Sequence, residues 1–275
     1  MRLALLALVT GCSFSGAQIA ATDTVDASAT GTPTPDAPDV VPTPDAPTSH
    51  LAPCATTDVT GLIACYEFED DFAADGTIHD SSANHLDAMA HGLAVATHAT
   101  ADQAAAVTPG VSTYVPQIPV LDRATGFTLA MWVKPSALPS EGGVMGLLDH
   151  EDQYAMDLGK SGGSVTMRCI LTGLDFYEWV DGISANTWSM FACTWDGDQV
   201  CAYRWTSASS HSSNCFSPGM PAAPTGSHGL AIGSLSDKGL PTFPLSGALD
   251  GIHIYNHALT ESGLCQAVGQ SGGCM

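Results

Sequence analysis

The nine cysteines are the residues whose number and spacing constrain the chemistry of this sequence most. Nine is an odd number, which in an exported protein leaves one cysteine to be explained. If Cys12 carries a lipid, as the residues that precede it suggest, eight cysteines remain to close four disulfides. No two of them are spaced as Cys-x-x-Cys, which argues against a zinc ribbon or a thioredoxin-type redox pair. We therefore predict that these eight are structural: Cys54, Cys65, Cys169, Cys193, Cys201, Cys215, Cys265 and Cys274.

Two ways of pairing the cysteines fit the order of the segments. Pairing each cysteine with its neighbour gives Cys54–Cys65, Cys169–Cys193, Cys201–Cys215 and Cys265–Cys274. Alternatively, Cys193 pairs with Cys201 across a hairpin turn, and Cys169 is left to pair with Cys215. In either case each bridge would stabilise the fold by about 2–4 kcal/mol, because it restricts the unfolded chain.

One segment, 175–181 (Asp-Phe-Tyr-Glu-Trp-Val-Asp), mixes aromatic rings with carboxylates. In a strand, Tyr177 and Trp179 would project to the same face. Aromatic planes beside hydrogen-bonding carboxylates suit the C–H face and the hydroxyl groups of a sugar. We predict Tyr177 and Trp179 as ligand-binding residues; the alternative is that one ring belongs to the core and the others have no role.

Signs of catalysis or of transition-metal binding are missing from the sequence. His79, His85, His91 and His98 lack zinc-type spacing, and we interpret them as scattered, exposed imidazoles. There is no His-Glu-x-x-His, Gly-x-Ser-x-Gly, Walker or dinucleotide-binding motif. We therefore expect a protein that is not an enzyme.

The charge balance excludes some partners. Acidic residues outnumber basic ones by 28 to 7, which gives a formal charge of −21. Such a field repels phosphate backbones, so we expect no nucleic-acid partner. No Lys/Arg cluster is present to bind an anionic membrane surface.

The first twelve residues predict export. Arg2 is followed by the short apolar run 3–9, which is too short to span a bilayer and resembles a cleaved signal segment. Residues 9–12 (Val-Thr-Gly-Cys) resemble the bacterial lipobox, in which the cysteine receives a lipid. We predict residues 1–12 as a lipoprotein signal segment and Cys12 as the lipidated residue, so that the membrane is contacted through this anchor only. The alternative is an ordinary signal peptide with an incidental cysteine.

Residues 13–52 have the composition of a linker. Thr34-Pro-Asp-Ala-Pro38 recurs as Thr43-Pro-Asp-Ala-Pro47, and residues 18–50 contain no aromatic residue. Proline at this density favours extended segments and cannot build a core. We predict a disordered, Pro/Thr/Asp/Ala-rich stalk ahead of a folded domain at 53–275.

The sequence of the predicted folded domain (53–275) predicts many short strands joined by turns. Phe127, Leu129, Met131 and Val133 alternate with other residues and would share one face. Asp196-Gly197 predicts a hairpin turn. Helical periodicity is confined to a short segment at 258–268. This pattern is typical of an all-β sandwich or jelly roll. Further strand-like runs lie at 61–69, 164–170, 187–195, 199–205, 229–233 and 249–255.

The order of these motifs resembles the laminin-G-like jelly roll of the concanavalin A-like lectin and glucanase superfamily. The matching pieces cover residues 61–268 and place Tyr66, Trp132 and Trp188 in strand motifs, so the resemblance implies that these three rings are core residues. The Tyr-x-Asp-Gly usual after the hairpin is here Tyr203-Arg-Trp-Thr. The pieces are Gly61-Leu62 with Tyr66 and Phe68, Asp80-Ser81-Ser82, Phe127-Thr128 with 132–135, Trp188 with Ala192, Thr194 and 196–197, Leu230 with 232–233, and Gly247 with Asp250, 254–256 and Leu259.

The resemblance also implies two possible sites. Members of the superfamily often bind calcium where the first and last strands meet, and Glu69, Asp70, Asp80 and Asp250 match positions of that kind. We predict one structural Ca²⁺ held by Glu69, Asp80 and Asp250, against the alternative that these are solvated turn carboxylates. Glycosidases of the superfamily carry Glu-x-Asp-x-x-Glu, which is absent here; the cluster at 149–152 reads as a polar turn.

We therefore expect an antiparallel two-sheet jelly roll that is lipid-anchored at the bacterial surface and binds an extracellular glycan or a surface protein. The alternatives are a structural display protein without a specific ligand and a degenerate glycosidase. The fold alone does not fix the ligand.

Overall fold

The computed structural model describes residues 54, 60–69, 72–99, 102–110, 112–122, 125–171, 177–207, 210–217 and 228–267. The predictions for the signal segment, Cys12 and the linker lie outside these ranges, as do Asp70 and Cys274. The elements are β1 (Leu62–Tyr66), α1 (Phe72–Asp75), β2 (Thr77–Ile78), β3 (Ala88–His91), β4 (Ala94–Ala99), β5 (Asp102–Val107), β6 (Ser112–Val115), η1 (Pro119–Leu121), β7 (Phe127–Pro135), β8 (Val144–His150), β9 (Tyr154–Ser161), β10 (Ser164–Leu171), β11 (Tyr177–Val180), β12 (Ser189–Trp195), β13 (Val200–Ser207), β14 (Ser210–Phe216), β15 (Leu230–Ile232), β16 (Leu235–Asp237), β17 (Leu240–Thr242), β18 (Gly247–Tyr255) and α2 (Glu261–Ala267).

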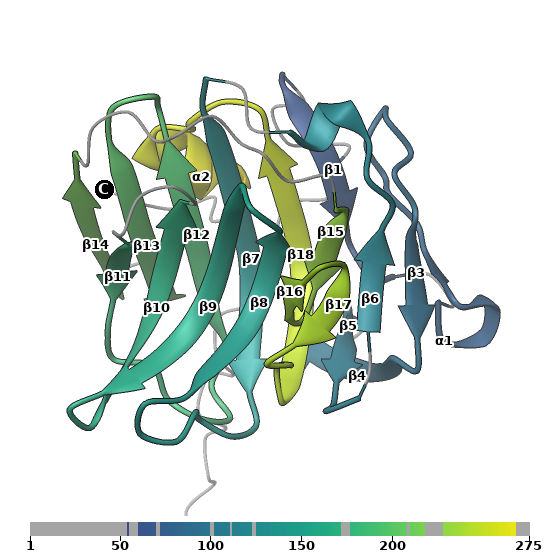
Figure 1. The fold of residues 1–275 in the computed structure, drawn as a ribbon, viewed down its shortest axis with the longest axis horizontal. Coiled ribbons are helices and arrows are strands. Elements are labelled where there is room, and N and C mark those ends of the chain that lie inside the picture. Colours follow the sequence, from purple (N-terminus) through teal and green to yellow (C-terminus); the bar gives the residue numbers. More distant parts are fainter. Residues whose placement is uncertain are drawn as a thin grey trace, which may run out of the picture. The chain divides into compact units, whose positions relative to one another are not determined.

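Two antiparallel sheets form the sandwich (Figure 1). The first sheet has the order β14-β13-β12-β7-β18-β5-β4, with β1 also paired to β18. The second has the order β11-β10-β9-β8-β15-β6-β3-β2, and the hairpin β16–β17 forms a separate pair. The predicted all-β, two-sheet class is confirmed.

Alternation along β7 explains how the first sheet is covered on both faces. Phe127, Leu129, Met131 and Val133 are buried in the main core between the sheets, as predicted. Ala130 and Trp132, which lie between them, belong to a second apolar cluster, to which α2 contributes Leu264 and Cys265. The short helix predicted near the C-terminus therefore packs on the outer face of this sheet, over the second cluster.

The three aromatic residues predicted to be core have different surroundings. Tyr66 is fully buried between the sheets, and its hydroxyl donates to the carbonyl of Leu86 at 2.7 Å. Trp132 is buried in the second cluster, on the outer face of the first sheet. Trp188 is only partly buried and packs against the second cluster, so it lies at the margin of the core instead of inside it. Its ring also packs against that of His98, which β4 of the same sheet places on this outer face.

Three disulfides follow the neighbour pairing. They join Cys54 to Cys65, Cys169 to Cys193 and Cys201 to Cys215. The alternative Cys193–Cys201 pair is therefore wrong. Cys265 is also disulfide-bonded, and its partner lies outside the described residues, so the Cys265–Cys274 pair stays a prediction. Bridges of this number are typical of proteins that fold in an oxidising compartment.

β18 is the strand that organises the first sheet. One of its edges pairs with β7 throughout, whereas the other pairs first with β5 (247–249) and then with β1 (252–255). A β-bulge separates Asp250 from His253 at this change of partner, and Gly251 there has φ +50°. Asp250 therefore faces the point where the end of β1 and the start of β5 meet.

In the part of the chain that the structure describes, no helix is long and apolar enough to cross a membrane.

Candidate binding groove and His98 cluster

A row of polar and aromatic side chains crosses the outer face of the second sheet. Asp157 in β9 is opposite Arg168 in β10, which is opposite Trp179 in β11. These three residues alternate with Met156, Met167 and other side chains that point into the core. The row therefore faces away from the core, and Trp179 remains 45% exposed.

Arg168 and Trp179, two members of this row, line a groove of about 540 Å³. A platform of aromatic surface and a set of hydrogen-bonding groups are thus gathered in one concave site, as ligand sites require. Trp179 is one of the two residues predicted to bind ligand, and its indole lines the groove. Tyr177 pairs with Ile170, but its side chain is outside the described part of the structure. The other lining residues are Gly142, Gly143, Val144, Gly159, Lys160, Ser161, Ser164, Thr166, Arg168 and Asp181.

Asp157 lies beneath the groove and fixes the position of Arg168, which lines it. Arg168 donates from Nε to Oδ1 at 2.6 Å and from Nη2 to Oδ2 at 2.5 Å. Asp157 is 1% exposed, and burial raises the pKa of its carboxyl while Arg168 opposes that rise. A Cβ on Gly159 would lie 2.8 Å from the Arg168 guanidinium carbon, so glycine there leaves room for the guanidinium against the backbone. Arg168 is therefore held by charge and by shape.

The hairpin β16–β17 packs over β8, and carboxylates hold it there. Asp149 Oδ2 accepts from the N–H of Ser236 at 2.7 Å. Glu151 accepts from the Ser236 hydroxyl and from the N–H groups of Lys238 and Gly239. The cluster at 149–152, interpreted from sequence as a polar turn, thus uses its carboxylates to anchor a loop. Burial, which outweighs the Ser236 hydrogen bond, raises the pKa of Asp149 to about 7.

We expect Asp149 to make the fold less stable as the pH rises. Its pKa in the folded protein, about 7, exceeds its ordinary value of 3.8, so its contribution is fully present below about pH 4 and is lost as the pH rises through 7. Asp149→Asn should remove this loss, so that its stability relative to the parent rises by about 2–3 kcal/mol between pH 5 and pH 8. Urea unfolding at both pH values measures the effect. Asp152→Asn removes an exposed neighbouring charge and serves as control; an equal change in both variants would contradict the assignment.

A second polar group, the His98 cluster (His98, Asp102 and Asp250), lies on the outer face of the first sheet. His98 Nδ1 is 2.5 Å from Asp250 Oδ2 and 3.4 Å from Asp102 Oδ2. The three side chains are only 9%, 11% and 8% exposed. Glu69 reaches the same place: its Oε1 accepts from the N–H of Gln103 at 3.0 Å, and its carboxyl hydrogen-bonds with that of Asp102. The interpretation of His98 as an exposed imidazole is wrong, because β4 carries it onto Asp250.

Burial and neighbouring carboxylates oppose ionisation in this cluster. Burial raises the pKa of Asp250 to about 6, against the opposing effect of His98. Burial and the hydrogen bond with Asp102 raise the pKa of Glu69 to about 7. Sequence reasoning found Glu69 and Asp250 but missed His98 and Asp102. The only local signal was the spacing of four between His98 and Asp102 around a short hairpin.

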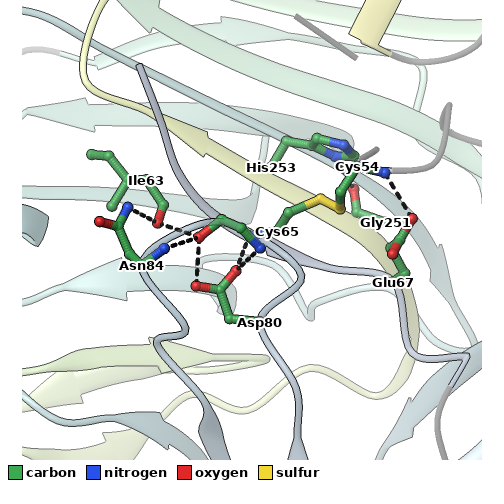
Figure 2. The surroundings of a disulfide bond; sticks show 9 residues. Cys54, Ile63, Cys65, Glu67, Asp80, Asn84, Gly251 and His253 are labelled. Carbon is green, nitrogen blue, oxygen red and sulfur yellow. Dashed lines mark hydrogen bonds between the residues drawn. A yellow bond between two sulfur atoms is a disulfide. The ribbon is translucent and has the colours of Figure 1, made fainter. Parts of the chain in front are cut away.

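Asp80, the third residue predicted to bind calcium, has a different environment (Figure 2). Its carboxylate accepts from the N–H groups of Cys65, Ser82 and Leu86 at 2.7–2.9 Å and from the Ser82 hydroxyl at 2.7 Å. These hydrogen bonds tie the turn at 80–86 to β1 beside the Cys54–Cys65 bridge. Both oxygens of Asp80 thus serve the fold, and the calcium prediction itself stays a prediction.

The donor set of the cluster differs from the one expected for calcium. Calcium prefers six to eight oxygen ligands. Here the carboxyl of Asp250 is hydrogen-bonded to Nδ1 of the His98 imidazole, so a nitrogen is among the potential ligand atoms. The residues that converge therefore do not form the all-oxygen set predicted from Glu69, Asp80 and Asp250.

Comparison with known proteins identifies the family. The profile described as concanavalin A-like lectin/glucanases superfamily (Laminin_G_3) matches residues 105–265. The chain belongs to this superfamily. The match spans β7, β12 and β18, whose motifs carry the resemblance in the sequence. No curated protein matches this chain by sequence.

Solved structures share the jelly roll at low sequence identity. Domain 4 of AbnA, a GH43 extracellular arabinanase from Geobacillus stearothermophilus, solved in complex with arabinotriose, is 20% identical; 75% of this chain and 98% of that domain are covered, with a TM-score of 0.51. The binding domain of Paraclostridial Mosquitocidal Protein 1 is 16% identical over 75% of this chain, with a TM-score of 0.52. That of botulinum neurotoxin DC, solved with rat synaptotagmin II, is 11% identical over 76%, with a TM-score of 0.53. This chain spans about half (51%) of each toxin structure, and at these identities the likeness shows the fold alone.

Proposed function

We propose that this chain is an exported, lipid-anchored surface module whose jelly roll binds a glycan and catalyses no reaction. The observation that carries this proposal is the groove with Trp179 on its wall. An indole that is 45% exposed in a concave site offers apolar surface to a ligand. Sugars present matching C–H faces to such planes.

The polar lining suits hydroxyl groups. Lys160 donates, Asp181 accepts, and the hydroxyls of Ser164 and Thr166 do both. Such groups fix the orientation of a ligand, while the aromatic plane supplies contact area. The complex of AbnA domain 4 with arabinotriose supports a sugar as the ligand class, since the same jelly roll accommodates an oligosaccharide there.

We expect Trp179→Ala to weaken glycan binding by about fivefold or more, because truncation of an aromatic contact that anchors a ligand typically costs over 1 kcal/mol. A carbohydrate array identifies the bound glycan, and titration calorimetry compares the variants. Phe216→Ala is the matched control, because Phe216 is also 44% exposed but lies in β14, at the edge of the other sheet. An array without any ligand, or equal affinity of wild type and Trp179→Ala, would refute binding at this groove.

A protein ligand is the second candidate. Leu240 and Phe243 are 68% and 57% exposed on and beside the hairpin over β8, which is apolar surface that a protein could cover. The toxin binding domain solved with synaptotagmin II shows that one neighbour of this fold is found with a protein partner. A degenerate glycosidase is tested separately by assaying laminarin-type polysaccharides.

The anchor part of the proposal rests on the signal segment and on the parity of the cysteines. Intact-mass analysis of protein purified from membranes, without reduction, is the direct test. A mature chain that begins at acylated Cys12 and has no free thiol supports it. A mature chain that begins elsewhere would make the domain freely secreted.

A further inference from the structure

We propose that His98, Asp102 and Asp250 bind a divalent first-row transition-metal ion, with zinc as the representative, on the outer face of the first sheet. This site is independent of the glycan groove, which lies on the outer face of the other sheet.

The geometry of the three side chains carries the proposal. One ligand atom from each lies within 4.8 Å of the other two. Zinc binds imidazole nitrogen and carboxylate oxygen at about 2.0–2.2 Å, so two ligands of one ion lie roughly 3–3.5 Å apart. The 3.4 Å between His98 Nδ1 and Asp102 Oδ2 has this value. The 2.5 Å between His98 Nδ1 and Asp250 Oδ2 is a direct hydrogen bond, which a shift of the carboxylate by about 1 Å would replace with two metal bonds.

The topology explains why these residues meet. His98 and Asp102 flank the hairpin between β4 and β5, and Asp250 stands at the bulge where β18 leaves β5 for β1. All three are on strands of one sheet, so the backbone holds the ligands in place without an ion. Preorganisation of this kind reduces the cost of binding.

The donor types select the ion. A neutral imidazole suits zinc, copper, iron and nickel, whereas calcium and magnesium prefer carboxylate, carbonyl and water oxygens. His98 is also oriented as a ligand should be: its ring packs against Trp132 and Trp188, with centroids 5.0 and 4.2 Å away. These two aromatic rings restrict the plane of the imidazole.

Charge and burial favour a cation at this place. Two carboxylates and one imidazole are about nine-tenths buried together, and Glu69 adds a third carboxylate through its contact with Asp102. A single imidazole, even when protonated, does not balance these groups. A dication bound between them would, and charge that is removed from water is stabilised by such pairing. Glu69 or a water molecule is the natural fourth ligand.

The test uses the purified full chain with its disulfides closed, after treatment with a chelator. Saturating zinc should raise the melting temperature by about 5–10 °C at a hundredfold excess over Kd, and calcium should not. Binding should be one ion per chain. Cobalt(II) should show visible d–d absorption, and copper(II) should quench the fluorescence of the neighbouring Trp132 and Trp188.

Variants assign the site. His98→Ala and the nearly isosteric Asp102→Asn should each weaken zinc binding at least tenfold. His91→Ala is the control, because it removes an exposed imidazole from β3 in the other sheet. Circular dichroism checks folding, and if His98→Ala does not fold, Asp102→Asn decides. The proposal is overturned if wild type binds no zinc, if calcium stabilises as much as zinc does, or if His91→Ala loses zinc while the cluster variants keep it.

Discussion

Replacing Arg168 with alanine should lower the free energy of unfolding by about 3–5 kcal/mol at neutral pH. Asp157 beneath it is 1% exposed, and the bidentate guanidinium is the cation that compensates its charge. Without Arg168 the carboxylate must stay buried and unpaired or take up a proton, and burial already raises its pKa. The loss of stability caused by Arg168→Ala should therefore become smaller as the pH falls and Asp157 is protonated. Urea unfolding at pH 7 and pH 4 measures it.

The partner substitution provides the control. Asp157→Ala should cost less, about 1–2 kcal/mol, since the side chain of Arg168 is 20% exposed and reaches water. The double variant should be more stable than Arg168→Ala alone, because no buried charge remains. Equal losses in the two single variants, with no dependence on pH, would mean that Arg168 is held by packing instead of charge.

Removing the Cys169–Cys193 bridge, as Cys169→Ala with Cys193→Ala, should lower the free energy of unfolding by about 3 kcal/mol. This bridge joins β10 of one sheet to β12 of the other through the core, across 24 residues of sequence. Without the crosslink the unfolded chain gains conformational entropy, and the two alanines also leave a cavity in the folded core. Guanidinium unfolding of the oxidised proteins measures the difference.

The Cys201–Cys215 bridge is the matched comparison. It links β13 to β14, neighbouring strands whose backbones are already hydrogen-bonded to each other, and it closes a shorter segment of 14 residues. Its removal should cost clearly less than removal of the bridge between the sheets. A larger loss at Cys201–Cys215 would show that the edge strand β14, and not the joining of the sheets, limits stability.

The two proposed sites occupy opposite outer faces of the sandwich. The groove lies over β9, β10 and β11, whereas the His98 cluster lies over β4, β5 and β18. Neither site shares a residue with the other. A loss of zinc binding in the His98→Ala variant should therefore leave glycan binding unchanged, and loss of glycan binding in Trp179→Ala should leave zinc binding unchanged.

The sequence by itself determined the features that are encoded over short distances. The alternation of Phe127, Leu129, Met131 and Val133 predicts a strand because residues two apart share a face. Asp196 and Gly197 predict the hairpin turn, where Asp196 indeed accepts from the N–H groups of Asp198 and Gln199 and Gly197 has φ +100°. Trp179 was predicted from its own strand pattern, and the order of the motifs was enough to indicate the superfamily.

Only the tertiary structure decided which distant residues meet. Strands β3 to β5 were not predicted, because their alanine-rich runs carry little hydrophobic periodicity. His98 and Asp250 are 152 residues apart, and their contact depends on β18 exchanging β5 for β1 at a bulge. Asp80 shows the converse: its type suits a metal, but the packing of its turn gives both oxygens to backbone N–H groups and a hydroxyl. The type of a residue determines which ligands its side chain is able to bind. The register of the strands determines which other side chains it contacts, and that register depends on many weak contacts between residues far apart in the sequence.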